Sequence, residues 1–305
     1  MKFYSRGKLL ISGEYLVLKG ATALAVPLKL GQVLQVGKSE RTEELSWESR
    51  EYGKTWFSTT LKLPSLEIAE SSDLTIAGNL VRHLEAIIRI KPEFIEKMAA
   101  SIVITDLGFN REWGFGSSSS LVSNLAYWAD LNPFELHNKV SSGSGYDVIC
   151  AREDGPVYFN TSIKGYNTEV INLHNSICNQ LFFVYLGRKE DTAKNVDSFL
   201  AKKRTFRVEK RIVSELTRHL GDATNIEDFG YYMKEHEQII SSLLKKPTLK
   251  EGIFKDLKGE AKSLGAWGGD FAMITWNDTR KELMEYLSSK NINTLFSFDE
   301  LIKTR

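Results

Sequence analysis

Residues 114–120 read Gly-Phe-Gly-Ser-Ser-Ser-Ser and stand between two regular patterns. Before them, residues 101–106 form an apolar run typical of a short strand. After them, apolar residues at three-to-four spacing predict an amphipathic helix that begins at about Ser118 and stops near Asn132-Pro133. Glycines in such a loop permit positive φ and let a ligand approach the backbone amides closely. A loop of this kind can hold an anion.

The start of the predicted helix gives a second reason to expect phosphate binding. Its first N–H groups have no partners within the helix, and the positive end of the helix dipole favours an anion. Serine hydroxyls add donors for phosphate oxygens and can bind Mg²⁺. A Gly/Ser turn with a serine at the helix N-cap explains the same residues equally well. The loop is not a Walker loop, because no Gly-Lys-Ser or Gly-Lys-Thr ends it.

The rest of the chain mixes strand-like and helix-like patterns. Continuous or alternating apolar runs predict strands at residues 8–18, 21–36, 43–63, 181–187, 271–276 and 293–297. Three-to-four spacing predicts helices at residues 73–90, 191–219, 226–244, 249–263 and 279–288. A soft boundary at 165–178 separates the two halves, so we expect domains at residues 1–170 and 171–305.

The composition is that of an ordinary globular protein, with 42% hydrophobic and 26% charged residues among 305. The formal charge of +1 lacks the basic excess that DNA-binding proteins carry. The two cysteines and five histidines show no metal-ligand or redox spacing. We find no signal-peptide pattern and no apolar stretch of about 18 residues. We therefore expect a cytoplasmic protein with no membrane and no nucleic-acid partner.

Three further segments place glycines beside polar residues. Residues 265–270 (Gly-Ala-Trp-Gly-Gly-Asp) hold more glycines than a helix C-cap needs. Residues 141–147 (SSGSGYD) present Asp147 either as a turn-capping residue or as a general base. Near the N-terminus, Lys8 begins a strand-like run that leads to residues 13–15 (Gly-Glu-Tyr). Each segment alone also has a structural explanation, such as close backbone contact, turn capping or solvation.

In order along the chain, these segments read GKLLISGEYLVL, GFGSSSS, GSGYDV and KSLGAWGGD. This order resembles the GHMP kinase superfamily, which includes galactokinase, homoserine kinase, mevalonate kinase and phosphomevalonate kinase. The resemblance extends from Lys8 to Ile274 and is strongest to the mevalonate and phosphomevalonate kinase branch and to the compact bacterial GYDIA-type kinases. It implies an α+β, two-domain fold. An N-terminal α/β domain similar to ribosomal protein S5 domain 2 would precede a C-terminal ferredoxin-like α+β domain, with the site in the cleft between them.

The resemblance also implies roles for individual residues. Two are expected to act on the transferred phosphoryl group as catalytic residues: Lys8 and Asp147. Those expected to bind the ATP phosphates are Gly114, Gly116, Ser117, Ser118 and Ser119. Those expected to bind Mg²⁺ are Ser118 and Glu135. Those expected to contact the acceptor substrate are Gly13, Glu14, Tyr15, Ser144, Gly145, Thr192, Gly265, Gly268 and Gly269.

The chain departs from the family pattern at several points. Trp267 replaces a glycine and would place a large ring where the family keeps open space, at the acceptor pocket. Glu135 is about one residue away from the spacing expected of a Mg²⁺-binding glutamate. Residues 188–211 hold nine basic side chains against four acidic ones. They form either a solvated helix face or a stretch in which residues 188–189 or Lys194 meet an anionic substrate.

The activity implied is that of an ATP- and Mg²⁺-dependent small-molecule kinase. It would transfer the γ-phosphate to a hydroxyl or phosphate acceptor, with mevalonate and phosphomevalonate as the expected anionic substrates. Phosphoryl transfer depends on positioning and electrostatic stabilisation, which suits a lysine–aspartate pair. Two alternatives remain open: a non-catalytic relative that binds a ligand or a partner, and an enzyme similar to diphosphomevalonate decarboxylase. A monomer and a homodimer both fit the sequence.

Overall fold

The computed structural model describes residues 1–187, 192–202, 204–265, 267 and 270–304. The chain packs as two compact units. Unit 1 comprises residues 1–7, 30–111 and 115–152, and unit 2 comprises residues 8–29, 112–114 and 153–305. Strands β1 (Lys2–Ser12) and β2 (Ala23–Lys38) each continue from one unit into the other. Packing therefore groups residues 153–170 with the C-terminal half, and a single division at residues 170/171 stays a prediction.

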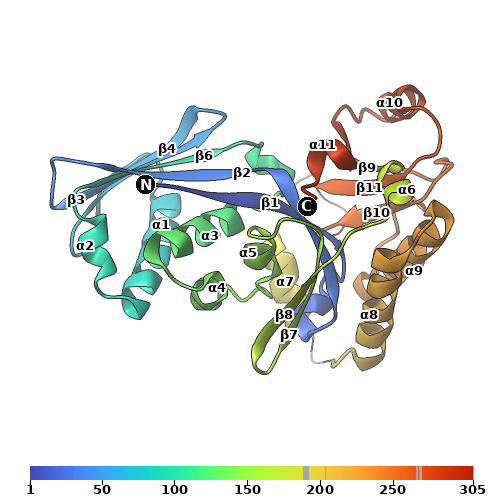
Figure 1. Ribbon diagram of the computed structural model, residues 1–305, viewed down its shortest axis with the longest axis horizontal. Helices are drawn as coiled ribbons and strands as arrows, with labels where there is room; N and C mark the ends of the chain where they lie inside the picture. The colour runs from blue at the N-terminus through green and yellow to red at the C-terminus, as the bar shows by residue number, and fades with distance from the viewer. Residues whose placement is uncertain (188–191, 203, 266, 268–269, 305) are drawn as a thin grey trace. The chain divides into compact units, whose positions relative to one another are not determined.

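Unit 1 is built on a sheet with helices on one face (Figure 1). Its strands run in the order β5, β4, β3, β6 and β2, and β1 pairs with β2. The bounds are Glu44–Glu51 for β3, Lys54–Lys62 for β4, Glu67–Ser71 for β5 and Ser101–Leu107 for β6. From β2 to β5 neighbouring strands are antiparallel, except for the parallel pair β3 and β6. Buried and more exposed residues alternate along β3 and β6, as expected when one face of a sheet is covered.

The helices of unit 1 are α1 (Leu74–Ile90), α2 (Phe94–Met98), α3 (Ser117–Ala129), α4 (Pro133–Val140) and α5 (Tyr146–Cys150). A 3-10 helix, η2 (Arg111–Trp113), precedes α3. The Asp73 side chain starts α1 by accepting from the N–H groups of Thr75 and Ile76. Asn132 caps α4 in the same way, with proline in the first turn. These caps confirm the helix predicted at residues 73–90 and the break predicted at Asn132.

Unit 2 contains a second, antiparallel sheet in the order β10, β11, β9 and β12. The bounds are Leu181–Tyr185 for β9, Ala261–Leu264 for β10, Phe271–Thr275 for β11 and Leu295–Ser297 for β12. Strands β7 (Val157–Ser162) and β8 (Gly165–Val170) extend the first sheet, because β7 pairs with the start of β2 and with β8. The mixture of sheets and helices confirms the predicted α+β class.

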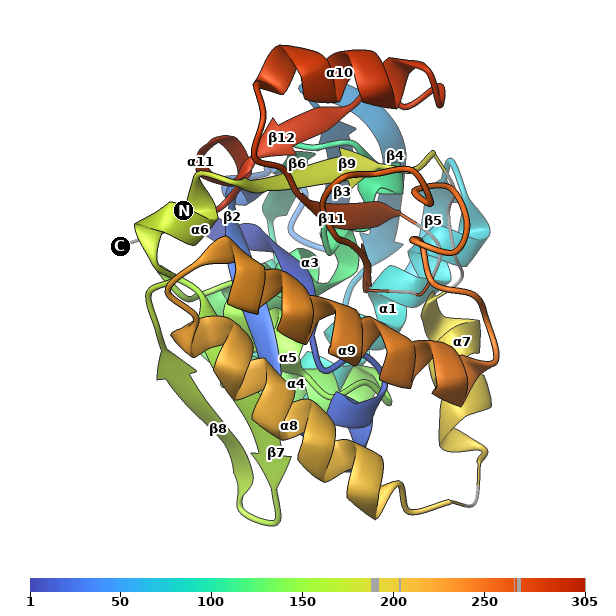
Figure 2. The ribbon, with the colours of Figure 1, turned by 90° about the vertical axis from the view of Figure 1, so that its right-hand side faces the viewer.

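The helices of unit 2 are η1 (Leu16–Lys19), α6 (Asn175–Cys178), α7 (Thr192–Leu200), α8 (Arg207–Asp222), α9 (Ile226–Leu244), α10 (Arg280–Ser288) and α11 (Phe298–Leu301). Helices α8 and α9 lie side by side (Figure 2). Among the residues described, no helix has the length and apolar character needed to cross a membrane.

Two predicted helices are wrong. The helix predicted at 191–219 is split into α7 and α8, because Phe206 before α8 is left-handed (φ 51°) and its ring is buried. The helix predicted at 249–263 is a series of turns followed by β10. The apolar residues of this segment do face the core, but they do so from turns. The Lys250 ammonium stabilises these turns by donating hydrogen bonds to two backbone carbonyl oxygens. Apolar spacing reports one buried side, and turns can produce that pattern as well as a helix can.

Candidate active site

The loop predicted to hold phosphate turns the chain into α3 through two left-handed glycines. Gly114 has φ 66° and Gly116 has φ 86°, values that residues with a side chain rarely adopt. Gly116 is the N-cap residue of α3, and no side chain caps this helix. The serine-capped turn, the alternative explanation of this sequence, is therefore not what the structure shows. The uncapped first turn leaves backbone N–H groups that a ligand can use.

The serines of this loop form two pairs. Ser119 and Ser120 are buried, and their hydroxyls each donate at 3.0 Å to carbonyl oxygens, those of Gly116 and Ser117. Ser117 and Ser118 instead line a hollow in unit 1, and Ser118 is exposed. Only Ser117 and Ser118 present hydroxyls to a ligand. Ser119, a predicted ATP residue, can contribute through its backbone N–H.

The hollow beside Ser118, which we call the Trp56 hollow, has a volume of about 200 Å³. Strand β4 contributes the indole of Trp56, and the Arg111 guanidinium carbon lies 4.2 Å from the centre of that ring. The indole Nε1 of Trp56 is buried and has no hydrogen-bond partner in the described part of the chain. Helix α1 contributes His83, whose pKa is lowered by burial, so its imidazole is neutral near pH 7. An aromatic face with an unused donor suits a flat heterocyclic ring.

Lys8 lies at Gly114, the first glycine of the loop predicted to hold phosphate. Its ammonium donates to the carbonyl oxygen of Gly114 at 3.2 Å. The carboxylate of Asp270 packs against the same glycine, because a Cβ built on Gly114 would lie 2.1 Å from Asp270 Oδ2. Any other residue at this left-handed position would have to displace the Asp270 carboxylate. Three residues far apart in the sequence thus meet within unit 2 at the entry to the loop.

Asp147 is carried by a tight loop in unit 1, just before the short helix α5. Gly145 has φ 79°, and a Cβ there would lie 2.7 Å from the ring of Phe134. One carboxylate oxygen of Asp147 accepts the N–H of the next residue, Val148, at 3.0 Å, and no side chain caps α5. Ser144 in the same loop is buried, and its hydroxyl has no hydrogen-bond partner among the described residues. The pairing of Asp147 with Lys8 stays a prediction.

The structure does not bring together the two residues predicted to bind Mg²⁺. Ser118 opens α3, whereas Glu135 lies in the first turn of α4, beyond the other end of α3. A helix of 13 residues rises by about 18 Å from end to end. The Glu135 carboxylate lines a different hollow, together with Arg89 and Lys139. Glu135 is therefore too far from Ser118 to share one metal ion with it.

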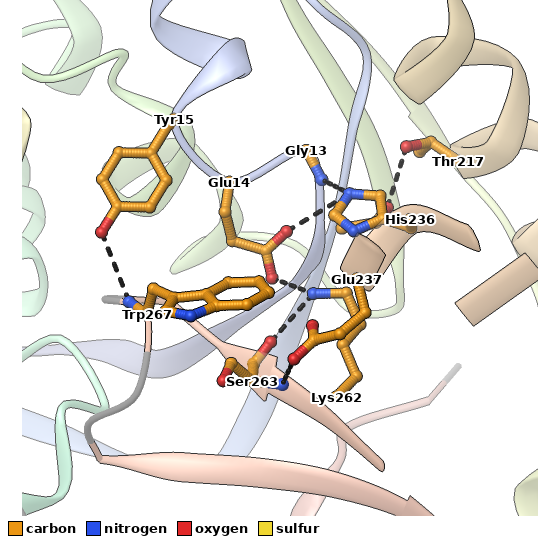
Figure 3. Close-up of polar contacts among 10 residues, drawn as sticks. Gly13, Glu14, Tyr15, Thr217, His236, Glu237, Lys262, Ser263 and Trp267 are labelled. Atoms are coloured by element: carbon orange, nitrogen blue, oxygen red, sulfur yellow. Dashed lines mark hydrogen bonds and ion pairs between the residues drawn. The ribbon is translucent and has the colours of Figure 1, made fainter. Parts of the chain in front are cut away.

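Residues 13–15, predicted to contact the acceptor, turn toward the interior of unit 2 (Figure 3). Glu14 is only 1% exposed, and its carboxylate forms an ion pair with the fully buried ammonium of Lys262. The N–H of Gly13 donates to Nε2 of His236 at 2.9 Å. These groups are occupied within the protein. The expectation of direct acceptor contact is therefore corrected for Gly13, Glu14 and Tyr15, which is also buried.

Glu14, His236, Glu237, Lys262 and Ser263 make up what we call the buried cluster. Burial raises the pKa of Glu14, and the ammonium of Lys262 opposes that rise. Burial lowers the pKa of His236 far below its usual range. The Nε2 atom of His236 accepts a hydrogen bond from the Gly13 N–H, so the imidazole ring is neutral. Glu14 Oε2 lies 3.4 Å from the same nitrogen, but a neutral ring forms no ion pair with it.

Glu237 is the most perturbed carboxyl of the buried cluster. Burial raises its pKa to about 8, although Lys262 and the N–H of Ser263 act in the opposite direction. Its Oε1 accepts that N–H at 3.2 Å, while its Oε2 has no hydrogen-bond partner in the described chain. Glu14 Oε2, His236 Nδ1 and Ser263 Oγ are equally unpartnered there. Each buried polar atom without a partner lowers the free energy of unfolding by about 1–3 kcal/mol. The unpartnered atoms of the buried cluster therefore reduce the stability of the protein.

Trp267 is a core residue of unit 2. Its side chain is 2% exposed and packs in a cluster with Tyr15, Phe199, Phe206 and Ile240. Its backbone N–H donates to the hydroxyl of Tyr15 at 3.3 Å. The expectation that this ring reshapes an open acceptor pocket is corrected, because the ring fills the interior.

Several predicted substrate residues cannot be placed. Gly268 and Gly269, and the basic residues Arg188 and Lys189, lie outside the described residues. The same holds for the side chains of Thr192 and Lys194, although their backbone belongs to α7. Gly265 is described: it is left-handed, with φ 67°, and a Cβ there would meet open space.

Sequence reasoning missed three residues of the buried cluster: His236, Glu237 and Lys262. The signal for Lys262 is a lysine within the short strand β10, where every residue is buried. The signal for the other two is weaker, since both fall on the buried face of an otherwise amphipathic helix, α9. Buried ionisable residues of this kind need partners, but the sequence does not say which.

Comparisons with known proteins identify the fold. No protein-family model matches the chain, and no curated protein matches its sequence. Solved structures match over its whole length. Phosphomevalonate kinase from Streptococcus pneumoniae, solved with phosphomevalonate and AMPPNP, superposes with a TM-score of 0.71 at 17% identity, covering 97% of this chain and 99% of that one.

Two further kinase structures superpose on the chain to a similar extent. Methanococcus jannaschii mevalonate kinase gives a TM-score of 0.70 at 15% identity, covering 100% of this chain and 98% of that one. Lactococcus lactis galactokinase, solved with galactose, gives 0.69 at 12% identity, covering 99% and 93%. The chain therefore has the two-domain α+β fold of the GHMP kinases, which confirms the fold that the four sequence segments predicted.

Proposed function

We propose that this protein is an ATP-dependent small-molecule kinase. The observation that carries the proposal is the uncapped start of α3, which opens on the left-handed Gly116 beside the Trp56 hollow. A helix start with unused N–H groups is an anion site, and the hollow offers a place for a base next to it. The fold shared with kinases agrees with this arrangement, and one of those kinases was solved with the ATP analogue AMPPNP.

The nucleotide would use the two parts of this site differently. The phosphates would lie at the first turn of α3, against backbone N–H groups and the hydroxyls of Ser117 and Ser118. The base would enter the Trp56 hollow, where the indole offers stacking and Nε1–H offers a donor. The hollow is smaller than the roughly 300–1,000 Å³ of a whole ligand pocket, as expected if it receives only the base.

Mg²⁺ fits this site through Ser118. Its hydroxyl is exposed at the phosphate end of the Trp56 hollow. Mg²⁺ usually takes only one or two protein ligands and completes its shell with water and substrate phosphates. When bound, it would neutralise charge on the phosphate oxygens.

The chain's own residues would then act on the transferred group. Phosphoryl transfer has a loose transition state with charge spread over the oxygens, so a fixed cation lowers its energy. Lys8, held at the Gly114 carbonyl, would supply that cation at the entry to the phosphate loop. Asp147 would accept the proton of an acceptor hydroxyl. Both assignments come from the family resemblance, and the position of Lys8 supports its part.

For the acceptor we propose mevalonate or phosphomevalonate. The support is the sequence resemblance to that kinase branch, together with fold neighbours that include mevalonate kinases and a phosphomevalonate kinase solved with phosphomevalonate. Galactokinase shares the fold equally, so the fold alone does not choose the acceptor. Both proposed acceptors are anions, which a local basic site can attract.

The test is acceptor-dependent ADP formation by the purified protein. ATP and Mg²⁺ would be supplied with mevalonate, phosphomevalonate, diphosphomevalonate, homoserine or galactose in turn. We expect ADP release with mevalonate or phosphomevalonate and none without an acceptor. The Asp147→Asn variant, prepared identically, controls for contaminating kinases. Release of CO₂ from diphosphomevalonate would instead indicate a decarboxylase, and no turnover with any compound would favour a binding protein.

A further inference from the structure

The Trp56 hollow has a polar wall residue that the function proposed above does not use, His83 of α1. Ile76, Asn79 and Leu80 of the same helix line the hollow together with it. Residues three or four positions apart lie on one side of a helix, so this side of α1 forms one wall. Every residue that lines the hollow belongs to unit 1. His83 therefore stands in the wall of the proposed base site.

The surroundings of His83 decide which of its two ring nitrogens carries the proton. Its Nδ1 lies 2.6 Å from the backbone carbonyl oxygen of Asn79, one turn earlier in α1. A carbonyl oxygen only accepts hydrogen bonds, so Nδ1 is the donor. Burial lowers the pKa of the imidazole, and the ring therefore lacks a second proton near pH 7. The other nitrogen, Nε2, is left as a hydrogen-bond acceptor.

No group in the described part of the chain uses this acceptor. His83 Nε2 has no hydrogen-bond partner there, and it is not closed off from solvent. Other acceptors of the hollow are already engaged. The Ser49 hydroxyl oxygen accepts two hydrogen bonds from side chains of β3 and β6, and the Gln32 amide oxygen accepts from the Ser120 hydroxyl at 3.1 Å. His83 Nε2 thus remains available to a bound ring.

A β-bulge supplies the flat wall of the same hollow. Strand β4 has one extra residue at Trp56, because Ser49 pairs with Phe57 and Arg50 pairs with Thr55. In a regular strand Trp56 and Phe57 would point to opposite faces of the sheet, yet both line the hollow. Bulges often redirect a side chain beside an active site. The bulge therefore adds a second aromatic side chain to the wall that a flat ring would contact.

Purine bases differ at the position that such an acceptor would read. Adenine carries an amino group at C6, which donates hydrogen bonds, whereas guanine and hypoxanthine carry an oxygen there, which accepts them. An amino group can donate to His83 Nε2. A C6 oxygen would set two acceptors against each other in a site with little room for water, which is unfavourable. The acceptor therefore favours adenine over a 6-oxo purine.

We propose that His83 is a specificity-determining residue of the base site, whose Nε2 accepts a hydrogen bond from the 6-amino group of adenine and disfavours 6-oxo purines. The inference rests on the ATP-dependent function proposed above, because it requires a base in the Trp56 hollow. His83 would act on the choice of nucleotide and not on phosphoryl transfer.

The first measurement needs no nucleotide. Nitrogen-15 NMR of protein labelled at histidine distinguishes a protonated imidazole nitrogen from an unprotonated one, and loss of the signal in His83→Phe assigns it. We expect a protonated Nδ1 and an unprotonated Nε2 near pH 7. A protonated Nε2 would overturn the proposal, because no acceptor would then face the base.

The second measurement is calorimetric titration with ATP or inosine triphosphate (ITP), each with Mg²⁺. His83→Phe keeps a flat ring of similar size and removes the acceptor. The matched control is His219→Phe, which replaces an exposed histidine of α8 whose ring stacks on Tyr232 at 4.9 Å. We expect the parent and the control to bind ATP at least about tenfold more tightly than ITP. In His83→Phe this preference should fall to about threefold or less.

The ratio of the two dissociation constants separates this inference from the function on which it rests. If the parent binds ATP and a folded His83→Phe protein keeps the parental preference, the inference is wrong and the nucleotide site stands. A parent that binds ATP and ITP equally also contradicts it. If the parent does not bind ATP at all, the proposed function fails, and the inference fails with it. Should His83→Phe not fold, His83→Gln takes its place, because its amide can donate or accept and should bind both nucleotides similarly.

Discussion

Left-handed glycines stand both in the predicted phosphate loop (residues 114–119) and beside the buried cluster, yet the polar groups of the two regions are used in opposite ways. At Gly116 the backbone opens into α3, and the N–H groups of its first turn are left without a side-chain cap. At Gly13 the N–H is bonded to His236, and the next residue, Glu14, is paired with Lys262. A left-handed glycine thus leaves backbone N–H groups unused in one place and joins a closed polar network in the other.

This difference predicts two kinds of mutational effect. Changes at residues that face a ligand should alter binding or turnover while stability is retained. Changes at residues that face the interior should alter stability first, and turnover only through position. Substitutions in both regions test this difference. We expect the largest change in stability from substitutions in the interior.

Trp267→Ala should destabilise the protein most. The ring is buried against Phe199 and Phe206, and removal of such a ring from a core costs about 3–5 kcal/mol. Urea unfolding measures the change. A loss below about 1 kcal/mol would show that the ring lies outside the core. Among molecules that stay folded, we expect the preference for one acceptor over another to be unchanged.

Asp147→Asn should act on turnover and not on stability. The asparagine oxygen can still accept the Val148 N–H, so the loop should keep its shape. We expect kcat to fall by about 10²-fold or more, roughly 2.7 kcal/mol. Steady-state kinetics, once an acceptor is known, measure the effect. Lys8→Met should behave similarly, and the double variant should lose much less than the sum. Near-parental turnover would remove Asp147 from the mechanism.

Much of the fold could be predicted from the sequence because its local signals are strong. The helix predicted at residues 226–244 is α9 to the residue, and the strand predicted at 101–106 is β6 with one residue more. The helix predicted at 249–263 is wrong because Gly259 packs directly against the backbone of Thr275. A Cβ built on Gly259 would lie 1.9 Å from the Thr275 carbonyl oxygen, and no local pattern in the sequence shows that approach. Tertiary contact decided the structure there.

The residues of the candidate site also divide into those with a local signal in the sequence and those brought together only by the fold. Gly114 and Gly116 could be predicted because a turn into a helix needs glycine and leaves unused N–H groups, both of which are local properties. The ion pair of Glu14 and Lys262 could not, because its partners are 248 residues apart and either residue alone reads as solvated. The Trp56 hollow could not be predicted for a related reason: its walls come from many separate parts of the chain, among them β4, α1, η2 and α3.

Glu237→Gln should change how stability depends on pH. The Glu237 pKa is about 8 in the folded protein, against about 4.3 for an exposed glutamate. A carboxyl whose pKa is raised by folding stabilises the folded protein fully at pH values below its unfolded pKa. That contribution to the free energy of unfolding is lost as the pH rises toward 8. The variant should therefore gain stability over the parent between pH 5 and 8, by up to about 1.4 kcal/mol per pH unit.

Chemical unfolding of both proteins at several pH values measures this difference. Lys262, Glu14 and the backbone N–H groups of Ser263 and Leu249 face Glu237 in both proteins, so the comparison isolates the one carboxyl. A difference that stays constant from pH 5 to 8 would show that Glu237 titrates as an exposed residue. That result would also weaken the contrast between a closed cluster and an open loop.

The most direct test of the phosphate loop is calorimetric titration with ATP and Mg²⁺ of two matched variants, Gly116→Val and Gly53→Val. Both glycines are left-handed, so each variant carries backbone strain, and a Cβ at Gly53, in the β3–β4 turn, would have no other atom within 4 Å. We expect Gly116→Val to raise the Kd for ATP by about tenfold or more, near 1.4 kcal/mol, and Gly53→Val to bind like the parent. Parental affinity in a folded Gly116→Val protein would contradict the assignment of this loop to ATP.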